Sequence, residues 1–319
     1  LIGGSNYSTP GVSSESFYGL GGNDFIDGGP GYDWSAYNLD GAISVGITVN
    51  MADGIVTGDP LLTGTDTLRS IEAVRGSVLA DTYDARGYGA NSLNAGNSGT
   101  GNEFEGMAGD DTIIGNGATK ISYYLAQAGV SITFSSNQGF INGVYQGASG
   151  IATGDASVGT DTFSGVNFVV GSAFDDTIIG SDNPSGTQET FRGYGGNDFI
   201  DGRGGIDGAA YNGSQVSGIT VNMAAGAVTG DITAGTDTLR SVEVIWGTPF
   251  SDVYDATGFG SNSINVGSNG AWNQFQAYGG NDTIIGNNST QIGYWSAAAG
   301  INAIFTANYA GYVDSGAGN

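Results

Sequence analysis

The sequence predicts an all-β fold, a parallel β-roll or β-solenoid built of tandem repeats. Three observations predict it: glycine-rich nonapeptides occur in tandem, a longer repeat runs along the chain, and short apolar stretches recur every eight to eleven residues. Glycine contributes 60 of the 319 residues, yet 39% of the residues are hydrophobic and are placed periodically, so a core can form. Each repeat then supplies short strands, and stacked repeats bury a shared core.

Residues 19–36 contain two nine-residue units in tandem. Each unit combines a glycine-rich turn, an aspartate at the sixth position and a short apolar strand, and the unit at 28–36 fits the pattern G-G-x-G-x-D. Glycine permits the positive φ angles that tight turns require. Such a turn aims backbone carbonyls into the same concavity as the aspartate carboxylate. Hard oxygen donors of this kind suit Ca²⁺, so the units predict calcium sites.

The nonapeptide resembles the calcium-binding repeat of the hemolysin-type family, also called RTX (repeats in toxin). The resemblance implies a roll in which successive units alternate between two sides and an ion lies between stacked turns. Each aspartate would then contribute to a site shared with a neighbouring coil. The resemblance also implies type I secretion of an unfolded chain, followed by calcium-dependent folding outside the cell.

A longer repeat is marked by four phenylalanines, which are spaced by 87, 87 and 84 residues: Phe17, Phe104, Phe191 and Phe275. The sequence GGNDFIDG at 21–28 also recurs at 195–202. The chain is therefore expected to have the order A-B-A-B: 1–16 as the tail of a preceding repeat, 17–103 as module A, 104–190 as module B, 191–274 as a second A and 275–319 as a partial second B. Both ends interrupt a repeat, which predicts a window from a longer array or a subunit that stacks end to end.

Within module A the tandem turns are followed by strand-like stretches at 43–51, 54–57 and 66–75, and then by a third calcium-type turn at 76–84. The expected strand centres after that point are Tyr83, Leu93, Phe104, Ile113 and Ile121. Polar residues stand shortly before them: Asp81, Asn91, Asn102 and Asp111. A ladder of side-chain oxygens along stacked turns accounts for this spacing. The four phenylalanines are expected to stack in the core.

The predicted calcium ligands are glycines, asparagines and aspartates of these turns. In the first half of the chain they are Gly19, Gly21, Asn23, Asp24, Gly29, Gly31, Asp33, Asp81, Asp111 and Asp176. In the second half they are Gly193, Gly195, Asn197, Asp198, Gly205, Asp207, Asp252, Gly279, Asn281 and Asp282. The turns of Asp81 and Asp252 hold fewer glycines. For these two residues an ordinary turn, in which the aspartate accepts backbone amides, stays open as an alternative.

Two basic positions carry further expectations. Lys120 stands in module B at the place of Asp33 in module A, so its ammonium is expected to occupy the position of the ion. Arg69 and Arg240 stand three residues before Glu72 and Glu243, which predicts a local ion pair or a contact at a strand edge.

Charge and composition exclude several classes of protein. The formal net charge is −24, with 7 Lys and Arg against 31 Asp and Glu, so nucleic acids and anionic membranes are unsuited as partners. A charge of this size opposes compaction unless cations neutralise it. The absence of cysteine excludes disulfides and thiol catalysis, and the absence of histidine removes the commonest general base. No apolar run is long enough to span a membrane.

These observations predict an extracellular or cell-surface structural β-solenoid that calcium stabilises, part of a bacterial RTX-type surface protein, adhesin, surface layer or filament. Every paired carboxylate belongs to the repeat, whereas an active site should interrupt one, so no catalytic residue is expected. The expected partners are calcium ions and further copies of the chain, end to end. Two alternatives stay open: a glycan-binding adhesion module, and the repeat tail of a type I-secreted protease, lipase or epimerase.

Overall fold

The computed structural model describes residues 1–3, 14–39, 42–136, 140–141, 144–145, 147–183, 187–213, 215–297, 302–307 and 310–314. In this part of the chain all 29 regular elements are strands, and most of their pairs are parallel. The all-β class and the largely parallel sheet are thereby confirmed. A search of the same residues finds no helix that could cross a membrane. The chain divides into two compact units, Leu1–Val170 and Gly171–Asn319.

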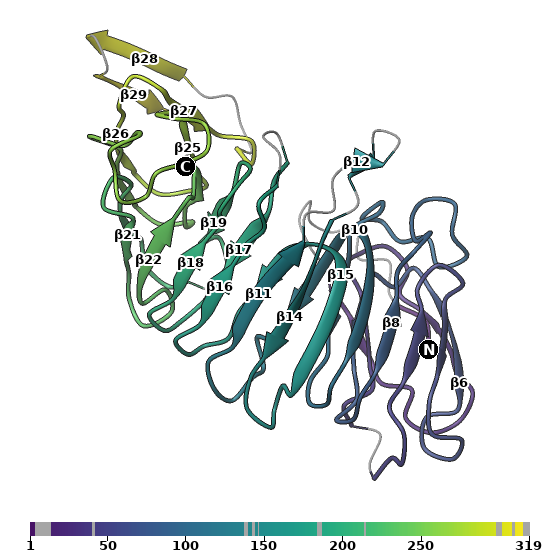
Figure 1. Ribbon diagram of the computed structural model, residues 1–319. Coiled ribbons are helices and arrows are strands. Elements are labelled where there is room, and N and C mark those ends of the chain that lie inside the picture. Colours follow the sequence, from purple (N-terminus) through teal and green to yellow (C-terminus); the bar gives the residue numbers. More distant parts are fainter. Residues whose placement is uncertain are drawn as a thin grey trace. The chain divides into compact units, whose positions relative to one another are not determined.

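In the first unit the chain alternates between two stacks of strands, here called ladder A and ladder B. Ladder A contains β2 (Phe25–Asp27), β4 (Thr48–Asn50), β5 (Ile55–Thr57), β6 (Thr65–Arg69), β8 (Thr82–Asp84) and the first halves of β10 (Thr112–Ser122) and β15 (Thr160–Val170). Ladder B contains β1 (Ser16–Phe17), β3 (Trp34–Ala36), β7 (Ala73–Arg75), β9 (Asn102–Glu105) and the second halves of β10 and β15. Figure 1 shows β8, β10 and β15 side by side.

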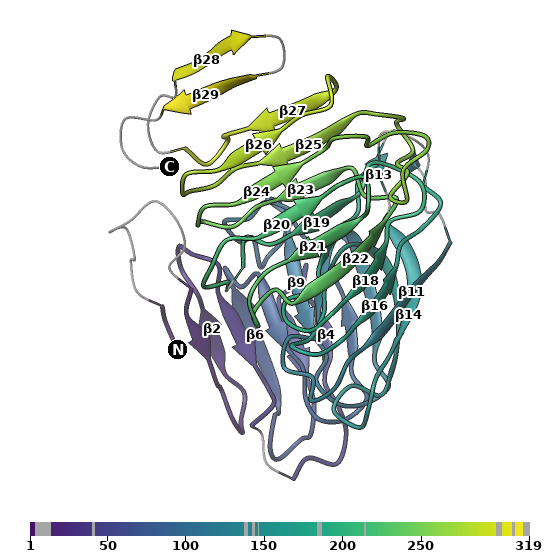
Figure 2. The same cartoon turned by 90° about the vertical axis from the view of Figure 1, so that its left-hand side faces the viewer.

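The second unit has the same two ladders in the same chain order. Its ladder A contains β16 (Thr177–Ile179), β18 (Phe199–Asp201), β20 (Thr220–Asn222), β21 (Ala227–Thr229), β22 (Thr236–Arg240), β24 (Val253–Asp255) and β26 (Thr283–Ile285). Its ladder B contains β17 (Thr190–Arg192), β19 (Gly208–Ala210), β23 (Val244–Trp246), β25 (Asn273–Gln276) and β27 (Thr290–Gly293). Figure 2 shows the later strands of both ladders. The repeat seen in the sequence is thus realised as a repeat of strand order, while the exact module boundaries stay predictions.

Antiparallel segments interrupt the parallel stacking. In the first unit β5 pairs antiparallel with both β4 and β6, and β21 does the same with β20 and β22 in the second unit. The chain reverses after β4 at Gly54, where φ is +66°, and so places three strands in ladder A without crossing to ladder B. Ser70, with φ +50°, ends β6 and splits the predicted stretch 66–75 into two strands. Further antiparallel pairs join β11 (Ser131–Ser136), β14 (Ala148–Thr153) and β15.

Four further strands, in two pairs, complete the described elements. The strands β12 (Phe140–Ile141) and β13 (Val144–Tyr145) form an antiparallel pair, as do β28 (Asn302–Ala307) and β29 (Ala310–Asp314). Neither pair joins the ladders described above.

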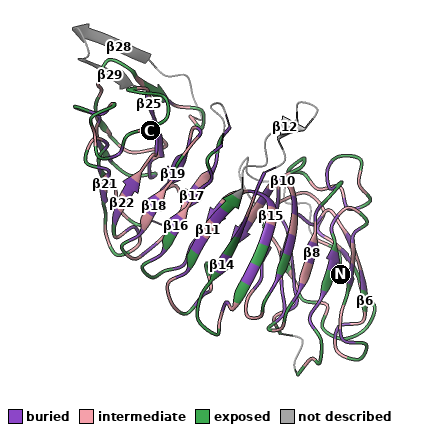
Figure 3. Ribbon diagram, viewed as in Figure 1, coloured by how far each residue is buried: buried purple, intermediate pink, exposed green. Residues whose placement is uncertain are grey.

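The core lies between the two ladders of each unit, where every second side chain of a strand is buried. Figure 3 shows this alternation along β14 and β15. The rings of Tyr83 and Phe104, from different ladders, stack at 4.8 Å, and Tyr254 and Phe275 do so at 4.9 Å. Phe104, Phe191 and Phe275 are all buried, which confirms their predicted place, whereas the fourth, Phe17 in β1, is only half-buried.

Four of the five expected strand centres lie within strands: Tyr83, Phe104, Ile113 and Ile121. The prediction for Leu93 is wrong, because this residue lies in a turn and is 63% exposed. The neighbouring Asn94 is buried instead. Its side chain accepts the amide of Ile71 at 3.0 Å and donates to the carbonyl of Ile71 at 2.9 Å, as an adjacent strand would. Asn91, expected just before this strand, is exposed in the same turn.

Candidate cation-binding site

Acidic side chains at the start of successive strands form two stacked columns. Because strands of a parallel ladder lie about 4.8 Å apart, residues in register are one strand spacing from each other. Carboxylate column A follows ladder A and comprises Asp24 with Asp66; Asp81, Asp111 and Asp161; Asp176, Asp198 and Asp237; and Asp252 with Asp282. Carboxylate column B follows ladder B and comprises Glu15, Asp33 and Glu72, and then Glu189, Asp207 and Glu243.

In most members of the columns one carboxylate oxygen accepts a backbone amide of the neighbouring column residue. In column A the amide of Asp81 donates to Oδ1 of Asp111 at 2.8 Å, and the amide of Asp111 donates to Oδ1 of Asp161 at 2.9 Å. In column B the amide of Asp207 donates to Oε2 of Glu243 at 2.9 Å. Equivalent bonds of 2.8–3.1 Å link the other neighbours within the columns. Each of these bonds fixes the direction of a carboxylate and occupies one of its two oxygens.

The second carboxylate oxygen is buried without a hydrogen-bond partner in five turns. These five atoms are Oδ2 of Asp24, Asp33, Asp111, Asp198 and Asp207. Each turn has the spacing Gly-x4-Asp, and the residue after its first glycine has positive φ: Leu20, Gly29, Met107, Tyr194 and Arg203. A buried polar atom left unpaired costs free energy, so each of these five atoms is an acceptor for a missing donor or cation. The acids in register with them differ, because Oδ2 of Asp237 accepts the hydroxyl of Tyr211 at 2.7 Å, and the hydroxyls of Tyr37 and Tyr123 serve Asp66 and Asp161.

The first glycine of each turn is required for space. A Cβ added to Gly106 or Gly193 would lie within 3.0 Å of Oδ2 of the aspartate five residues later, and the same holds for Gly19, Gly28 and Gly202. None of these five glycines has positive φ. The positive φ angles expected of the tight turn are therefore found at other positions. The positive φ angles occur at the next residue and again two residues later, at Gly22, Gly31, Gly109, Gly196 and Gly205.

We therefore expect Gly106→Ala and Gly193→Ala to lower the free energy of unfolding by about 1–3 kcal/mol each, because the added methyl group displaces a buried carboxylate. Gly260→Ala is the matched control, since its nearest neighbour would be Cβ of Ala271 at 3.6 Å and its φ is not positive. Urea unfolding in calcium measures the difference. Equal stability of all three variants would contradict the close packing of carboxylate on glycine.

Donor oxygens from neighbouring coils converge on these turns. Oδ2 of Asp24 and Oδ2 of Asp66 lie 2.9 and 3.3 Å from one point, the position of the missing Cβ of Gly19. A Cβ placed on Gly28 would lie within 3.0 Å of both Oδ2 of Asp33 and the carbonyl oxygen of Ser70. A Cβ placed on Gly202 would lie equally close to Oδ2 of Asp207 and the carbonyl oxygen of Ser241. Among the described residues no three acidic side chains gather into a metal-binding group. Backbone carbonyls would therefore have to complete the coordination of any ion.

Burial and stacking of like charges raise the pKa of these carboxyls. The pKa rises to about 9 for Asp111, mainly by burial and then by the neighbouring Asp161 and Asp81. It rises to about 9 for Asp198, by burial and Asp237, and to about 10 for Asp207, by burial, Glu189 and Glu243. For Asp161 and Asp237 it reaches about 7, again chiefly by burial. At neutral pH the buried carboxyls must therefore hold protons or be neutralised by cations.

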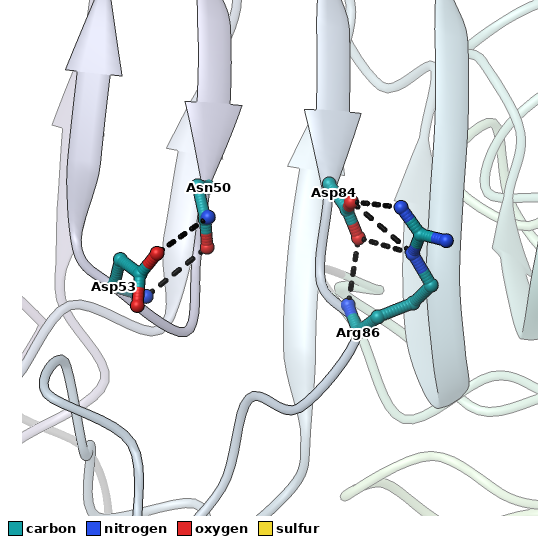
Figure 4. Close-up of polar contacts among 4 residues, drawn as sticks. All are labelled: Asn50, Asp53, Asp84 and Arg86. Atoms are coloured by element: carbon teal, nitrogen blue, oxygen red, sulfur yellow. Dashed lines mark hydrogen bonds and ion pairs between the residues drawn. The ribbon is translucent and has the colours of Figure 1, made fainter.

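Three basic side chains of the described residues form ion pairs, and all three pairs lie outside the columns. Arg86 pairs with Asp84 at 2.6 Å on the surface, where Asp53 also receives a hydrogen bond from Asn50 (Figure 4). Arg75 pairs with Glu105 at 2.7 Å, and Lys120 pairs with Glu103 at 2.5 Å. Basic side chains thus neutralise Glu105, Asp84 and Glu103, and none of these three ion pairs includes an acid of the columns.

The expectation for Lys120 is wrong, and of the two alternatives for Arg69 the described residues show a contact at the strand and no ion pair with Glu72. Lys120 is in register with Glu103, and the residue in register with column B is Thr119, so the ammonium lies one position beyond the predicted ion position. Arg69 donates to the carbonyl of Leu68 at 2.7 Å. The carboxylate of Glu72 accepts the amides of Asp33 and Asn97 at 2.8 and 2.6 Å, in place of the predicted ion pair.

The remaining predicted ligands lie at the edges of the turns. Gly21, Gly195 and Gly279 face carbonyls of adjacent coils, those of Leu61, Ile232 and Pro249. Oδ1 of Asn23 accepts the amide of Thr65 at 2.8 Å, Oδ1 of Asn197 accepts that of Thr236 at 3.0 Å, and the amide of Asn281 donates to Oγ of Ser251 at 2.9 Å. These asparagines link coils and do not gather with the aspartates.

The turn of Asp282 departs from the pattern. Ala277 stands at its first-glycine position, and Asp282 is half-buried, so its carboxylate has room that the others lack. Its Oδ1 still accepts the amide of Asp252 at 2.9 Å.

The columns contain seven acids that the sequence interpretation did not include as ligands: Glu15, Asp66, Glu72, Asp161, Glu189, Asp237 and Glu243. A signal for three of them was present, since Asp66, Asp161 and Asp237 each occupy a GTDT sequence. The four glutamates lie outside any glycine-rich turn and carry no local signal. No family model matches this chain, and no curated protein matches it.

Proposed function

We propose that this protein is an extracellular structural β-solenoid whose coils are held together by calcium ions. The observation that carries the proposal is the set of five buried, unpartnered Oδ2 atoms, one in each glycine-rich turn. They are the atoms that the nonapeptide pattern assigns to calcium, and they recur with the repeat. A cation between coils would neutralise two stacked acids at once.

The chain itself contains a comparison that favours a cation over a proton. In the first unit Glu103 and Glu105 are paired with Lys120 and Arg75. In the second unit the residues at these four positions are Gln274, Gln276, Gln291 and Trp246, so acids and bases are absent together. The five turn aspartates with an unpartnered Oδ2 behave differently, because they occur in both units and none of the ion pairs found among the described residues includes them. Acids kept in this way require a positive charge from solution.

Calcium fits the donor set better than other metals. The available donors are carboxylate and carbonyl oxygens, and the chain has neither histidine nor cysteine for transition metals. Ca²⁺ accepts six to eight oxygens in irregular geometry, whereas Mg²⁺ demands near-ideal octahedral geometry and retains water. The residues that would hold calcium are the aspartates of the five turns, with carbonyls such as those of Ser70 and Ser241 from the adjacent coil. Bound there, calcium would supply the charge that the columns lack.

The location and the structural role follow from this dependence on calcium. Extracellular calcium modules bind with Kd values of about 10⁻⁴–10⁻³ M, so their sites fill outside the cell. The resemblance to RTX repeats adds type I secretion to this proposal. A solenoid of stacked coils presents extended faces and suits a segment of a surface protein, adhesin, surface layer or filament. The proposed partners are calcium ions and further copies stacked end to end, and the proposed role is not enzymatic.

Calorimetric titration with Ca²⁺ tests the proposal. Asp33→Asn and Asp207→Asn, one in each unit, are each expected to lower the number of bound ions by about one, because the neutral amide cannot replace a buried carboxylate ligand. Asp84→Asn changes an acid that Arg86 already pairs on the surface, so it should leave the number unchanged. The proposal fails if the wild-type chain binds no calcium at millimolar concentration, or if all three variants titrate alike.

A further inference from the structure

Three turns share the Gly-x4-Asp spacing but differ from the five described above. They run from Gly76 to Asp81, from Gly171 to Asp176 and from Gly247 to Asp252. The first glycine is again pressed against Oδ2 of the aspartate, since a Cβ would lie within 3.0 Å of it. The next residue, however, is Ser77, Ser172 or Thr248. None of these three residues has positive φ.

The hydroxyl group and the amide of this residue satisfy the aspartate. The amide of Ser77 donates to Oδ2 of Asp81 at 2.7 Å, and its hydroxyl donates to Oδ1 at 2.7 Å. Oδ1 of Asp81 also accepts the amide of Ile47 at 2.7 Å. The hydroxyl of Ser77 in turn accepts the amide of Leu79 at 3.1 Å. Both carboxylate oxygens are therefore occupied by donors of the protein.

The same arrangement recurs in the second unit. Ser172 donates its amide and hydroxyl to Asp176 at 2.6 and 2.8 Å, and Thr248 donates both to Asp252 at 2.8 Å. Their hydroxyls accept the amides of Phe174 and Phe250 at 3.1 and 3.0 Å. Three independent turns thus use one solution, and none of their Oδ2 atoms is among the unpartnered ones.

We infer that the residue after the first glycine decides which turns take a cation, and that a serine or threonine there takes the place of the ion. This inference rests on the proposed function. It removes Asp81, Asp176 and Asp252 from the predicted ligands and leaves Asp24, Asp33, Asp111, Asp198 and Asp207, together with Asp282, whose turn belongs to neither type. The Asp81 turn differs in this way from its neighbour, although both are buried in one column. Burial raises the pKa of Asp81 only to about 6, against about 9 for Asp111, because Ser77 and Ile47 donate to its charged form.

The hydroxyl-bonded turns lie directly next to cation turns. The amide of Asp81 donates to Asp111, and the amide of Asp176 donates to Asp198, both at 2.8 Å. Each unit therefore contains coils whose turns close without calcium and which present an ordered backbone to a turn that needs it.

Calcium titration of the full chain with matched variants in adjacent coils tests the inference. Asp81→Asn and Asp176→Asn are expected to leave the number of bound ions unchanged, whereas Asp111→Asn and Asp198→Asn each lower it by about one. The inference is overturned if Asp81→Asn or Asp176→Asn loses an ion as its neighbour does. If the wild-type chain binds no calcium, the proposed function fails instead, so the two failures are distinguishable.

A second set of variants keeps the test decisive if an aspartate variant does not fold. Ser77→Ala and Ser172→Ala remove only the hydroxyl and are expected to lower Tm by about 2–4 °C or more without lowering the number of bound ions. Thr248→Ser keeps the hydroxyl and should change neither quantity. Loss of a bound ion in either alanine variant would show that these turns hold calcium, and would overturn the inference.

Discussion

Removal of calcium at neutral pH is expected to unfold this protein or to leave its coils loosely associated. With Kd values of about 10⁻⁴–10⁻³ M, calcium at ten times Kd adds about 1.4 kcal/mol per independent site. Five sites then contribute about 7 kcal/mol, which is comparable to the roughly 5–15 kcal/mol that stabilises an ordinary domain. Without the ions, five buried Oδ2 atoms and the stacked acids around them are left uncompensated.

Far-UV circular dichroism and urea unfolding measure this effect, in 5 mM CaCl₂ and in excess EGTA at pH 7.5. We expect the β-sheet signal and the unfolding transition to be lost in EGTA and to return when calcium is restored. Magnesium at the same concentration is the control for ionic strength and charge. A chain that keeps the same transition midpoint in EGTA would show that the columns need no ion.

The second large effect is a reversal of the pH dependence of stability by calcium. In metal-free protein the carboxyls of Asp111, Asp198 and Asp207 have pKa values of about 9, 9 and 10 when folded, against 3.8 for an ordinary aspartate. A raised pKa in the folded state means that the folded chain binds the proton more tightly. The stabilisation that each protonated carboxyl contributes is therefore fully present below about pH 4 and is lost as pH rises toward 9–10.

Between pH 5 and 8 each of these carboxyls would lower the free energy of unfolding by up to about 1.4 kcal/mol per pH unit. Calcium requires the ionised carboxylate, so it competes with the proton, and its binding releases protons. In saturating calcium, stability is expected to rise over the same interval. The sign of the slope therefore depends on whether the ion is bound.

Thermal unfolding at pH 5, 6.5 and 8 measures both slopes, with protein stripped of metal on a chelating resin and with the same protein in 5 mM CaCl₂. In the stripped protein the expected Tm falls from pH 5 to 6.5 and no folded transition is left at pH 8, whereas in calcium the Tm rises with pH. Asp84→Asn should preserve both slopes, because Asp84 lies at the surface beside Arg86. A Tm that rises with pH in both conditions would contradict the assignment of buried, uncompensated carboxyls.

The sequence was most informative where a residue repeats with the coil. Phe104 and Tyr83 were predicted as strand centres because apolar spacing reflects which side chains face the core, and both rings pack there. The aspartates of the glycine-rich turns were found for the same reason. Leu93 shows the limit of this reasoning, because the residues of a turn can have the same spacing as those of a strand. In this turn the side-chain carboxamide of Asn94 makes the hydrogen bonds that an adjacent strand would make.

Pairing between coils could not be read from the sequence. Lys120 lies one residue beyond the position that is in register with the aspartates of column B. Its place could not be predicted, because register is set by backbone hydrogen bonds between segments that are distant in the sequence. Glu72 gave no signal of its own, since its partner Asp33 is 39 residues away. The antiparallel strand β5 follows a chain reversal at Gly54. The residue types around Gly54 do not differ from those of the turns that connect parallel strands, so the reversal could not be predicted.

The most direct test of the account is an anomalous-scattering map from crystals of the intact chain grown in 5 mM CaCl₂. The account predicts calcium peaks beside Oδ2 of Asp24, Asp33, Asp111, Asp198 and Asp207, each shared with a carbonyl or carboxylate of the adjacent coil. Ordered turns with no anomalous peak beside any of these five atoms would contradict it.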